Sequence, residues 1–165
     1  MLDNYERLAA VIAATGDIAP ERLQRLVFVL QALGAPLSYM YQMNFERPYS
    51  EDLESDLTLL VSQGLLESER DRRGEVLRVG PTKATAAFLE RGEDVRRYSK
   101  AIEELQKADP RILNFAATFG AWRELRYEVP TALKRTREAV EEKTQREVAV
   151  EGERLLERLG LLTGR

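Results

Sequence analysis

The stretch "RPYSEDLESDLTLLVSQGLLE", residues 47–67, decides the fold that the sequence predicts. Ser50 is a residue type favoured as a helix N-cap, and leucines then recur at helical spacing from Leu53 to Leu60. Gly64 supplies the left-handed residue that commonly ends a helix, and a strand-like segment follows it. A helix followed directly by a hairpin is the order of the recognition helix and wing in winged-helix variants of the helix-turn-helix.

The segments before this stretch read as helices. Apolar residues at helical spacing predict helices over about residues 3–16 and 19–34. We expect a further helix from about Leu37 to Phe45, interrupted before Pro48 because the residue preceding a proline disfavours the α conformation.

After Gly64 the hydrophobic pattern changes. It predicts a hairpin with strands near 65–69 and 75–79 and a turn over 71–74. In the second strand, Val76 or Leu77 is expected to face the core. A helix restarts after Thr82, and everything from Glu93 onward reads as helical.

The predicted fold is therefore mainly α and winged-helix-like, with several helices, one β-hairpin and a C-terminal helical extension. Residues 1–92 form the winged-helix-like module and residues 93–165 the extension, which we expect to pack on it as one compact unit. The sequence "LLVSQGLL" at 59–66 is echoed by "LLERLGLL" at 155–162, which a shared helix-stop pattern explains more simply than duplicated winged modules.

Composition narrows the function. The 165 residues include no cysteine and no histidine, which excludes disulfides, thiolate catalysis, Cys/His zinc sites and histidine acid–base chemistry. No glycine-rich phosphate loop or nucleophile motif is found, so we expect a protein that is not an enzyme and that uses no cofactor or metal. With no apolar run near 18 residues and no leader pattern, we expect no membrane span and a cytoplasmic location.

Charge argues against direct reading of DNA by the predicted recognition helix. The net charge is −3, with a pI near 5.3, and the helix carries Glu51, Asp52, Glu54 and Asp56 without a lysine or arginine. Carboxylates in a first helical turn are favoured by the helix dipole, but phosphates would repel them. A cation held by Asp52 and Asp56 lacks a third ligand, so no metal site is predicted.

The aromatic and methionine-rich segment before this helix has two interpretations. Its side chains pack between helices in the core, or they form an adaptable apolar groove for a partner. Together with the acidic helix start, the segment defines a candidate partner-binding surface. Its residues are Tyr39, Tyr41, Phe45, Arg47, Tyr49, Glu51, Asp52 and Glu54.

The predicted wing provides the candidate for DNA. Its turn "RDRRG" places long cationic side chains on a projection, which suits contact with phosphates. The alternative is a solvated hairpin, because Glu67, Glu69, Asp71 and Glu75 nearly cancel those cations. The possible DNA-binding residues are Arg70, Arg72, Arg73, Arg78 and Lys83.

The segment 39–67 resembles the YwgA-like and SocA-like (Panacea-domain) proteins of bacteria and phages. These proteins show aromatic residues, a Gly-Pro-Tyr-Ser step, spaced leucines with an aspartate, and then Gly-Leu-Ile. Arg47 stands in place of the family's first glycine and Leu66 in place of its isoleucine, and "NFAATFGAW" followed by Lys143 resembles the C-terminal helices. The matching residues are Pro48, Tyr49, Ser50, Leu53, Asp56, Leu57, Leu60, Gly64 and Leu65.

The resemblance implies a small non-enzymatic module, since SocA-like and Panacea-domain proteins are associated with antitoxin action. Our leading expectation is an interaction or regulatory protein, antitoxin-like, that binds another protein such as a toxin. The alternative is a winged-helix DNA-binding regulator that uses the wing arginines. A third possibility is a structural homodimer with no other ligand.

Overall fold

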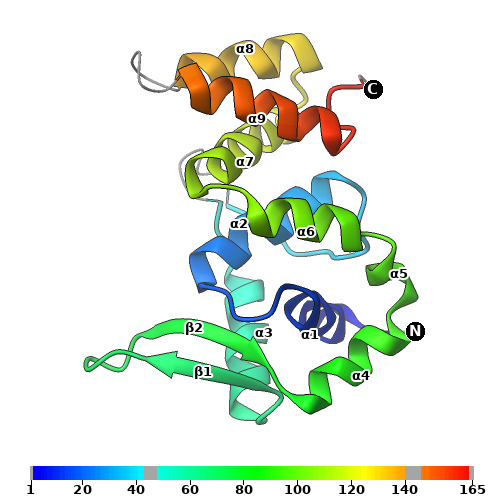
Figure 1. The fold of residues 1–165 in the computed structure, drawn as a ribbon, viewed down its shortest axis with the longest axis vertical. Coiled ribbons are helices and arrows are strands. Elements are labelled where there is room, and N and C mark those ends of the chain that lie inside the picture. Colours follow the sequence, from blue (N-terminus) through cyan, green and yellow to red (C-terminus); the bar gives the residue numbers. More distant parts are fainter. Residues whose placement is uncertain (1, 43–47, 140–145, 164–165) are drawn as a thin grey trace.

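The structure is a computed structural model that describes residues 2–42, 48–139 and 146–163 (Figure 1). This part of the chain is mainly helical, with one antiparallel two-stranded hairpin, as the sequence predicts. The elements are α1 (Asn4–Thr15), α2 (Pro20–Ala32), α3 (Glu51–Ser62), β1 (Leu66–Arg70), β2 (Val76–Pro81), α4 (Lys83–Arg91), α5 (Glu93–Arg96), α6 (Ser99–Lys107), α7 (Pro110–Glu124), α8 (Val129–Ala139) and α9 (Arg146–Arg158).

The winged-helix-like end is built on α1. This helix begins at Asp3, which forms a capping box with Glu6, and it packs against α3, α4 and β2. A short extended segment after α1 joins the hairpin, because Ile18 and Val79 exchange backbone hydrogen bonds of 2.8 and 2.9 Å. Figure 1 shows the hairpin projecting away from the helices at this end of the molecule.

The hairpin matches the predicted strands within two residues. Its register pairs Leu66 with Pro81 and Glu69 with Arg78, and a bulge follows between Glu69 and Arg70. Of the two candidate inward residues, Val76 packs against the core, whereas Leu77 is 47% exposed. Val79 of β2 is almost completely buried, and Gly80 beside it is buried too.

The predicted helix from Leu37 to Phe45 is wrong over the residues that the structure describes, up to Gln42. The chain reverses at Gly34, whose φ is +94°, and then runs extended. The side-chain amide of Gln31 satisfies this backbone: Tyr39 N–H donates to Oε1 (2.9 Å), and Nε2 donates to the Tyr39 carbonyl (3.1 Å). A side chain on α2 thus replaces the bonds that a helix would have made. Residues 43–47, including Phe45 and Arg47, lie outside the described part.

The C-terminal helices α7, α8 and α9 lie at the other end of the molecule from the hairpin (Figure 1). The described chain after Glu93 is helical, as the sequence predicts, but it is divided between α5 and α6. Asp109 caps α7, and Pro110 begins it. Helix α7 is buried along most of its length and packs against α2, α8 and α9. No helix among the described residues is both long and apolar enough to cross a membrane.

Candidate functional site

The start of α3 is held rigidly by buried polar groups. Ser50 is fully buried, and its hydroxyl accepts the Leu53 amide at 3.3 Å. The Gln24 side chain fixes the same residue on both sides, accepting from the Ser50 amide (3.0 Å) and donating to the Ser50 carbonyl (3.1 Å). The first turn of α3 therefore has a defined position relative to α2.

This position directs the carboxylates outward. Leu53, Leu57 and Leu60 are buried, which leaves Glu51 and Asp52 exposed and Glu54 half-buried. The N-terminus of α3 stabilises such negative charges through the helix dipole.

Tyr49 lies beside these acids and is 41% exposed. Partial desolvation raises the pKa of its phenol, and the charges of Glu54 and Glu51 raise it further. We call Tyr49, Glu51, Asp52 and Glu54 the α3 acidic surface.

Met40 is a further exposed apolar side chain and was not among the predicted site residues. It is 78% exposed and lies two residues from Gln42, whose amide donates to the Tyr49 carbonyl at 2.9 Å. In an extended segment alternate side chains face opposite sides, so Met40 points away from the core that Tyr39 enters. The sequence signal for this outward direction was the spacing of two between Tyr39 and Tyr41, which places Met40 on the opposite side.

Tyr39 and Tyr41 do not belong to an exposed surface. Tyr39 is 4% exposed, and its hydroxyl donates to Asp56 Oδ2 at 2.7 Å. The Tyr41 hydroxyl donates to the Gln24 carbonyl at 3.0 Å, and its ring packs edge-to-face on Phe28 at 4.9 Å. Burial raises the pKa of both phenols. Tyr39 is therefore a core residue, and Tyr41 is partly buried against the core, so neither is included in the candidate surface.

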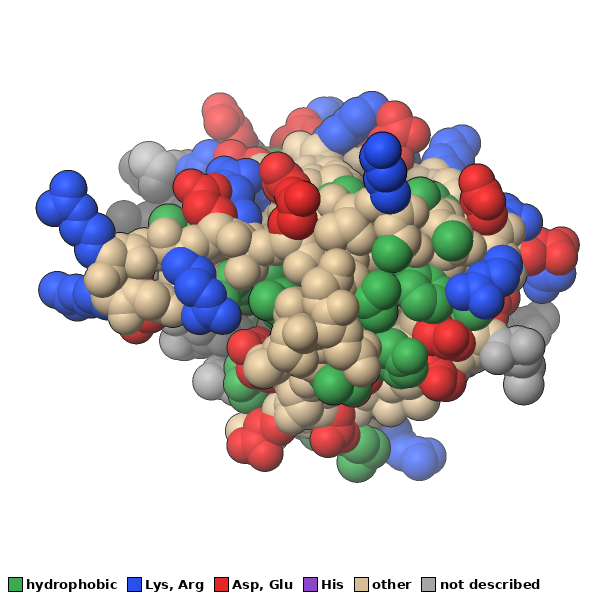
Figure 2. Space-filling view, turned by 90° about the horizontal axis from the view of Figure 1, so that it is seen from below, with side chains coloured by type: hydrophobic (Ala, Val, Ile, Leu, Met, Phe, Trp, Pro, Cys, Tyr) green, Lys and Arg blue, Asp and Glu red, His purple; other side chains and the backbone are tan. Residues whose placement is uncertain are grey.

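The wing tip is also well defined. Asp71 Oδ1 accepts the amides of Arg73 (2.8 Å) and Glu75 (3.0 Å), and Gly74 adopts a φ of +82° to close the turn. Arg70 donates to the Gly74 carbonyl at 2.8 Å. Figure 2 shows basic side chains at the projecting end of the hairpin.

The five cations proposed for DNA are not equivalent. Arg72 and Arg73 are exposed at the tip and form no ion pair within 4 Å with the part of the chain that the structure describes. Arg78 is paired in register with Glu69, so its charge has an acidic neighbour. Lys83 is exposed at the first turn of α4.

A shallow groove of about 140 Å³ separates α3 from the hairpin. Its wall is apolar and includes Leu57, Val61 and Val79, while Glu54 and Arg70 contribute opposite charges. The groove is below the size typical of small-molecule sites, about 300–1,000 Å³, but can receive a side chain of a partner. Within residues 2–42, 48–139 and 146–163, no three acidic side chains converge in a way that could hold a metal ion.

Comparison with known proteins gives one informative similarity. Over 122 residues, the chain is 25% identical to a protein of Bacillus subtilis (strain 168) named "Uncharacterized protein YwgA", covering 72% of this chain and 74% of that protein. No family model matches the chain, and no solved structure does. The similarity agrees with the YwgA-like resemblance of residues 39–67.

Proposed function

We propose that the protein is a non-catalytic interaction module that binds another protein through the α3 acidic surface. The observation that carries this proposal is the combination of exposed Tyr49 with Glu51 and Asp52 on a helix start fixed by Gln24 and Ser50. Aromatic side chains that are exposed yet held by a rigid scaffold suit protein interfaces, because little conformational entropy is lost when they are covered.

The charge of this surface favours a basic partner. Carboxylates at the start of α3 would be repelled by the phosphates of a nucleic acid, whereas lysine or arginine side chains would be attracted. Such complementarity acts mainly on the association rate and weakens with salt. Met40 and the apolar groove beside α3 offer contact area that does not depend on charge.

The resemblance to SocA-like and Panacea-domain proteins supports an antitoxin-like role, in which the partner is a toxin. Several matching residues have structural roles in this chain: Ser50 caps α3, Asp56 accepts the Tyr39 hydroxyl, and Gly64 has a φ of +71° at the end of the helix. The resemblance therefore concerns the framework of the surface, and partner choice depends on exposed residues such as Tyr49 and Asp52.

The test is capture of a partner followed by titration of the purified pair. The double variant Asp52→Lys with Glu54→Lys should reduce the affinity of that partner at least tenfold, and raising the salt concentration should slow association of the wild type. The matched control is Glu67→Lys with Glu69→Lys, which makes the same charge change on exposed positions of β1. Equal affinities for the two double variants would rule out the α3 acidic surface. A stable dimer that captures no other ligand would favour a structural homodimer instead.

The alternative function is DNA binding through the wing, and the exposure of Arg72 and Arg73 on a closed turn is the observation in its favour. Binding to duplex DNA should then weaken steeply with salt and be lost on Arg72→Ala with Arg73→Ala. Lys134→Ala with Arg137→Ala, on α8 far from the wing in Figure 1, is the matched loss of two charges. Weak binding that both double variants reduce equally would indicate non-specific attraction and would exclude the wing as the DNA site.

A further inference from the structure

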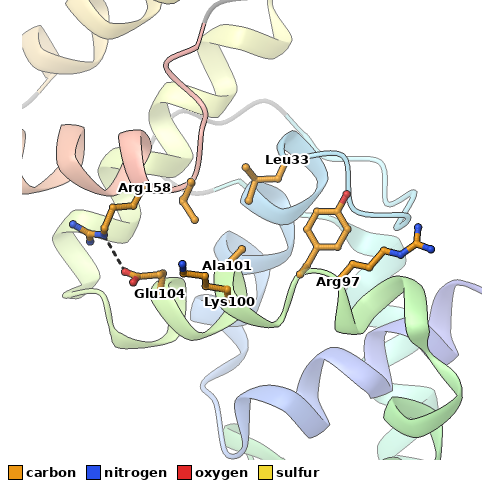
Figure 3. Close-up of a pocket in the computed structure, with 8 residues that line it drawn as sticks. Leu33, Arg97, Lys100, Ala101, Glu104 and Arg158 are labelled. Carbon is orange, nitrogen blue, oxygen red and sulfur yellow. Dashed lines mark hydrogen bonds and ion pairs between the residues drawn. The ribbon is translucent and has the colours of Figure 1, made fainter.

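A cavity of about 510 Å³ lies between the end of α2, the first turns of α6 and the end of α9 (Figure 3). Small-molecule sites typically measure about 300–1,000 Å³, so its size suits a compact organic ligand. None of the residues lining it belongs to α3 or to the wing, and it is therefore distinct from the surfaces considered above.

One side of the cavity is apolar. Leu33 at the end of α2 lies above Ala101 of α6 (Figure 3), and Leu159 after α9 and Tyr98 before α6 also line the cavity. Tyr98 is held under the turn that ends α2, since a Cβ on Gly34 would meet its hydroxyl at 3.5 Å. This wall can cover the nonpolar body of a ligand.

The remaining lining is predominantly cationic, with Arg97, Lys100 and Arg158 against a single acid, Glu104. Glu104 is already engaged, because its Oε2 accepts from Arg158 Nε at 3.1 Å. Arg97 pairs with Glu93 only at 3.8 Å, and both side chains are about three-quarters exposed, so that pair contributes little. Lys100 forms no ion pair within 4 Å with any residue that the structure describes. A chain with net charge −3 therefore concentrates positive charge here.

Helix ends of both signs meet at the cavity. The carbonyls of Leu30 on α2 and Leu156 on α9 accept 2.9 Å hydrogen bonds from Ala35 and Leu161, so these helix ends are capped within the protein. Helix α6 begins at the cavity with Tyr98 as an N-cap that supplies no side-chain hydrogen bond. The positive end of its dipole adds to the charge of Lys100.

We infer that this cavity binds a small amphipathic anion, a carboxylate attached to a short apolar body. The carboxylate lies at Lys100, and the apolar body covers Leu33 and Leu159. Because α2 belongs to the winged-helix-like part and α6 and α9 to the C-terminal helices, such a ligand contacts both parts and stabilises their packing.

The test uses the full chain and two probes. Anilinonaphthalene sulfonate, an anion on an aromatic body, is titrated into the protein by fluorescence, and octanoate is added as a competitor. We expect saturable binding of the dye and its displacement by octanoate. Octan-1-ol, which keeps the chain but lacks the charge, should displace the dye at least tenfold less well. Octanoate should also raise the melting temperature.

Two variants place the binding in the cavity. Lys100→Gln should weaken octanoate binding by about tenfold, the scale of one charge-assisted hydrogen bond, whereas Lys107→Gln on the same helix should leave it unchanged. Ala101→Phe should block dye binding by filling the apolar side, and Lys100→Gln remains decisive if that variant fails to fold. Absence of saturable dye binding, equal displacement by octanoate and octan-1-ol, or equal effects of the two lysine variants would overturn the inference. Each result is independent of partner binding at α3.

Discussion

The hydroxyl of Tyr39 donates a 2.7 Å hydrogen bond to Oδ2 of Asp56, joining the extended segment after α2 to the middle of α3. The same hydroxyl is 3.3 Å from the Asn4 carbonyl, at the start of α1. One of the four carboxylates of the recognition-helix position is therefore directed to the protein's own core. Among the acids of α3, Asp56 accepts a structural hydrogen bond, whereas Glu51 and Asp52 are exposed at the first turn.

Removing the Tyr39 hydroxyl should destabilise the fold without changing the α3 acidic surface. Tyr39→Phe deletes a hydrogen bond to a charged acceptor, so we expect the free energy of unfolding to fall by about 1.5–3 kcal/mol. Urea denaturation measures this change. Asp52→Asn alters an exposed carboxylate on the same helix and should stay within about 0.5 kcal/mol of the wild type. A Tyr39→Phe protein as stable as the wild type would show that the hydrogen bond contributes nothing.

The phenols of Tyr39 and Tyr41 predict a loss of folding stability at alkaline pH. Burial, followed for Tyr39 by the bond to Asp56, raises the pKa of Tyr39 and Tyr41 above the ordinary tyrosine value of 10.0. In the unfolded chain both phenols lose their protons near pH 10, whereas the folded state retains them. The folded state then binds more protons, so stability is fully present below pH 10 and falls as the pH rises further.

Melting temperatures between pH 8 and pH 11 test this prediction. The slope above pH 10 should become shallower in Tyr39→Phe and shallower still when Tyr41→Phe is added. Tyr5→Phe is the control, because it removes the hydroxyl of another tyrosine, on α1. Identical slopes in all four proteins would contradict the assignment of the alkaline transition to Tyr39 and Tyr41.

Local sequence signals were enough to predict much of the fold. Ser50 and Gly64 set the ends of α3, and Asp109 with Pro110 sets the start of α7. The recurring pattern around Gly64 and Gly160 also ends two helices in the structure, since both glycines have positive φ. These features were predictable because each depends on residues within one turn of the chain.

Features that depend on distant residues were not predictable in this way. The segment 37–42 is extended because Gln31 bonds to its backbone, and Ile18 pairs with Val79 across 61 positions of sequence. Exposure of Glu51 and Asp52 followed from the leucine spacing of α3, but burial of Tyr39 required knowing that its segment is not a helix. The cavity at Lys100 is assembled from three separate elements and has no signature within any of them.

Arg22 should be needed to hold the end of α6 against α2. Its Nη2 donates to the carbonyls of Leu105 (2.9 Å) and Gln106 (2.8 Å) and also contacts the carbonyl of Ala108. The last carbonyls of a helix lack partners within that helix, and the guanidinium also complements the helix dipole. We expect Arg22→Ala to lower the free energy of unfolding by about 1.5–3 kcal/mol.

Hydrogen exchange adds a local measurement to this prediction. Amides near residues 105–109 should lose protection in Arg22→Ala, and Arg22→Lys should recover only part of it because an ammonium lacks the guanidinium fork. Arg111→Ala removes an exposed arginine whose partner is Asp109 and should change protection little. If amide exchange in α6 is the same in all three variants, the anchoring role of Arg22 is contradicted.

Gly152 should be essential for packing α9 on α7. A Cβ at this position would lie 2.3, 2.6 and 3.0 Å from three ring atoms of Phe115, which is buried. Alanine normally favours a helix over glycine by about 1 kcal/mol, but overpacking a core costs about 1–3 kcal/mol. We expect the clash to dominate, so Gly152→Ala should lower the melting temperature. Val150→Ala, at an exposed position of the same helix, should change it little.

The cause can be tested with Phe115→Leu, which removes the ring. Adding Gly152→Ala to that background should lower stability less than it does in the wild type. Equal costs in the two backgrounds would show that the Phe115 ring is not the obstacle.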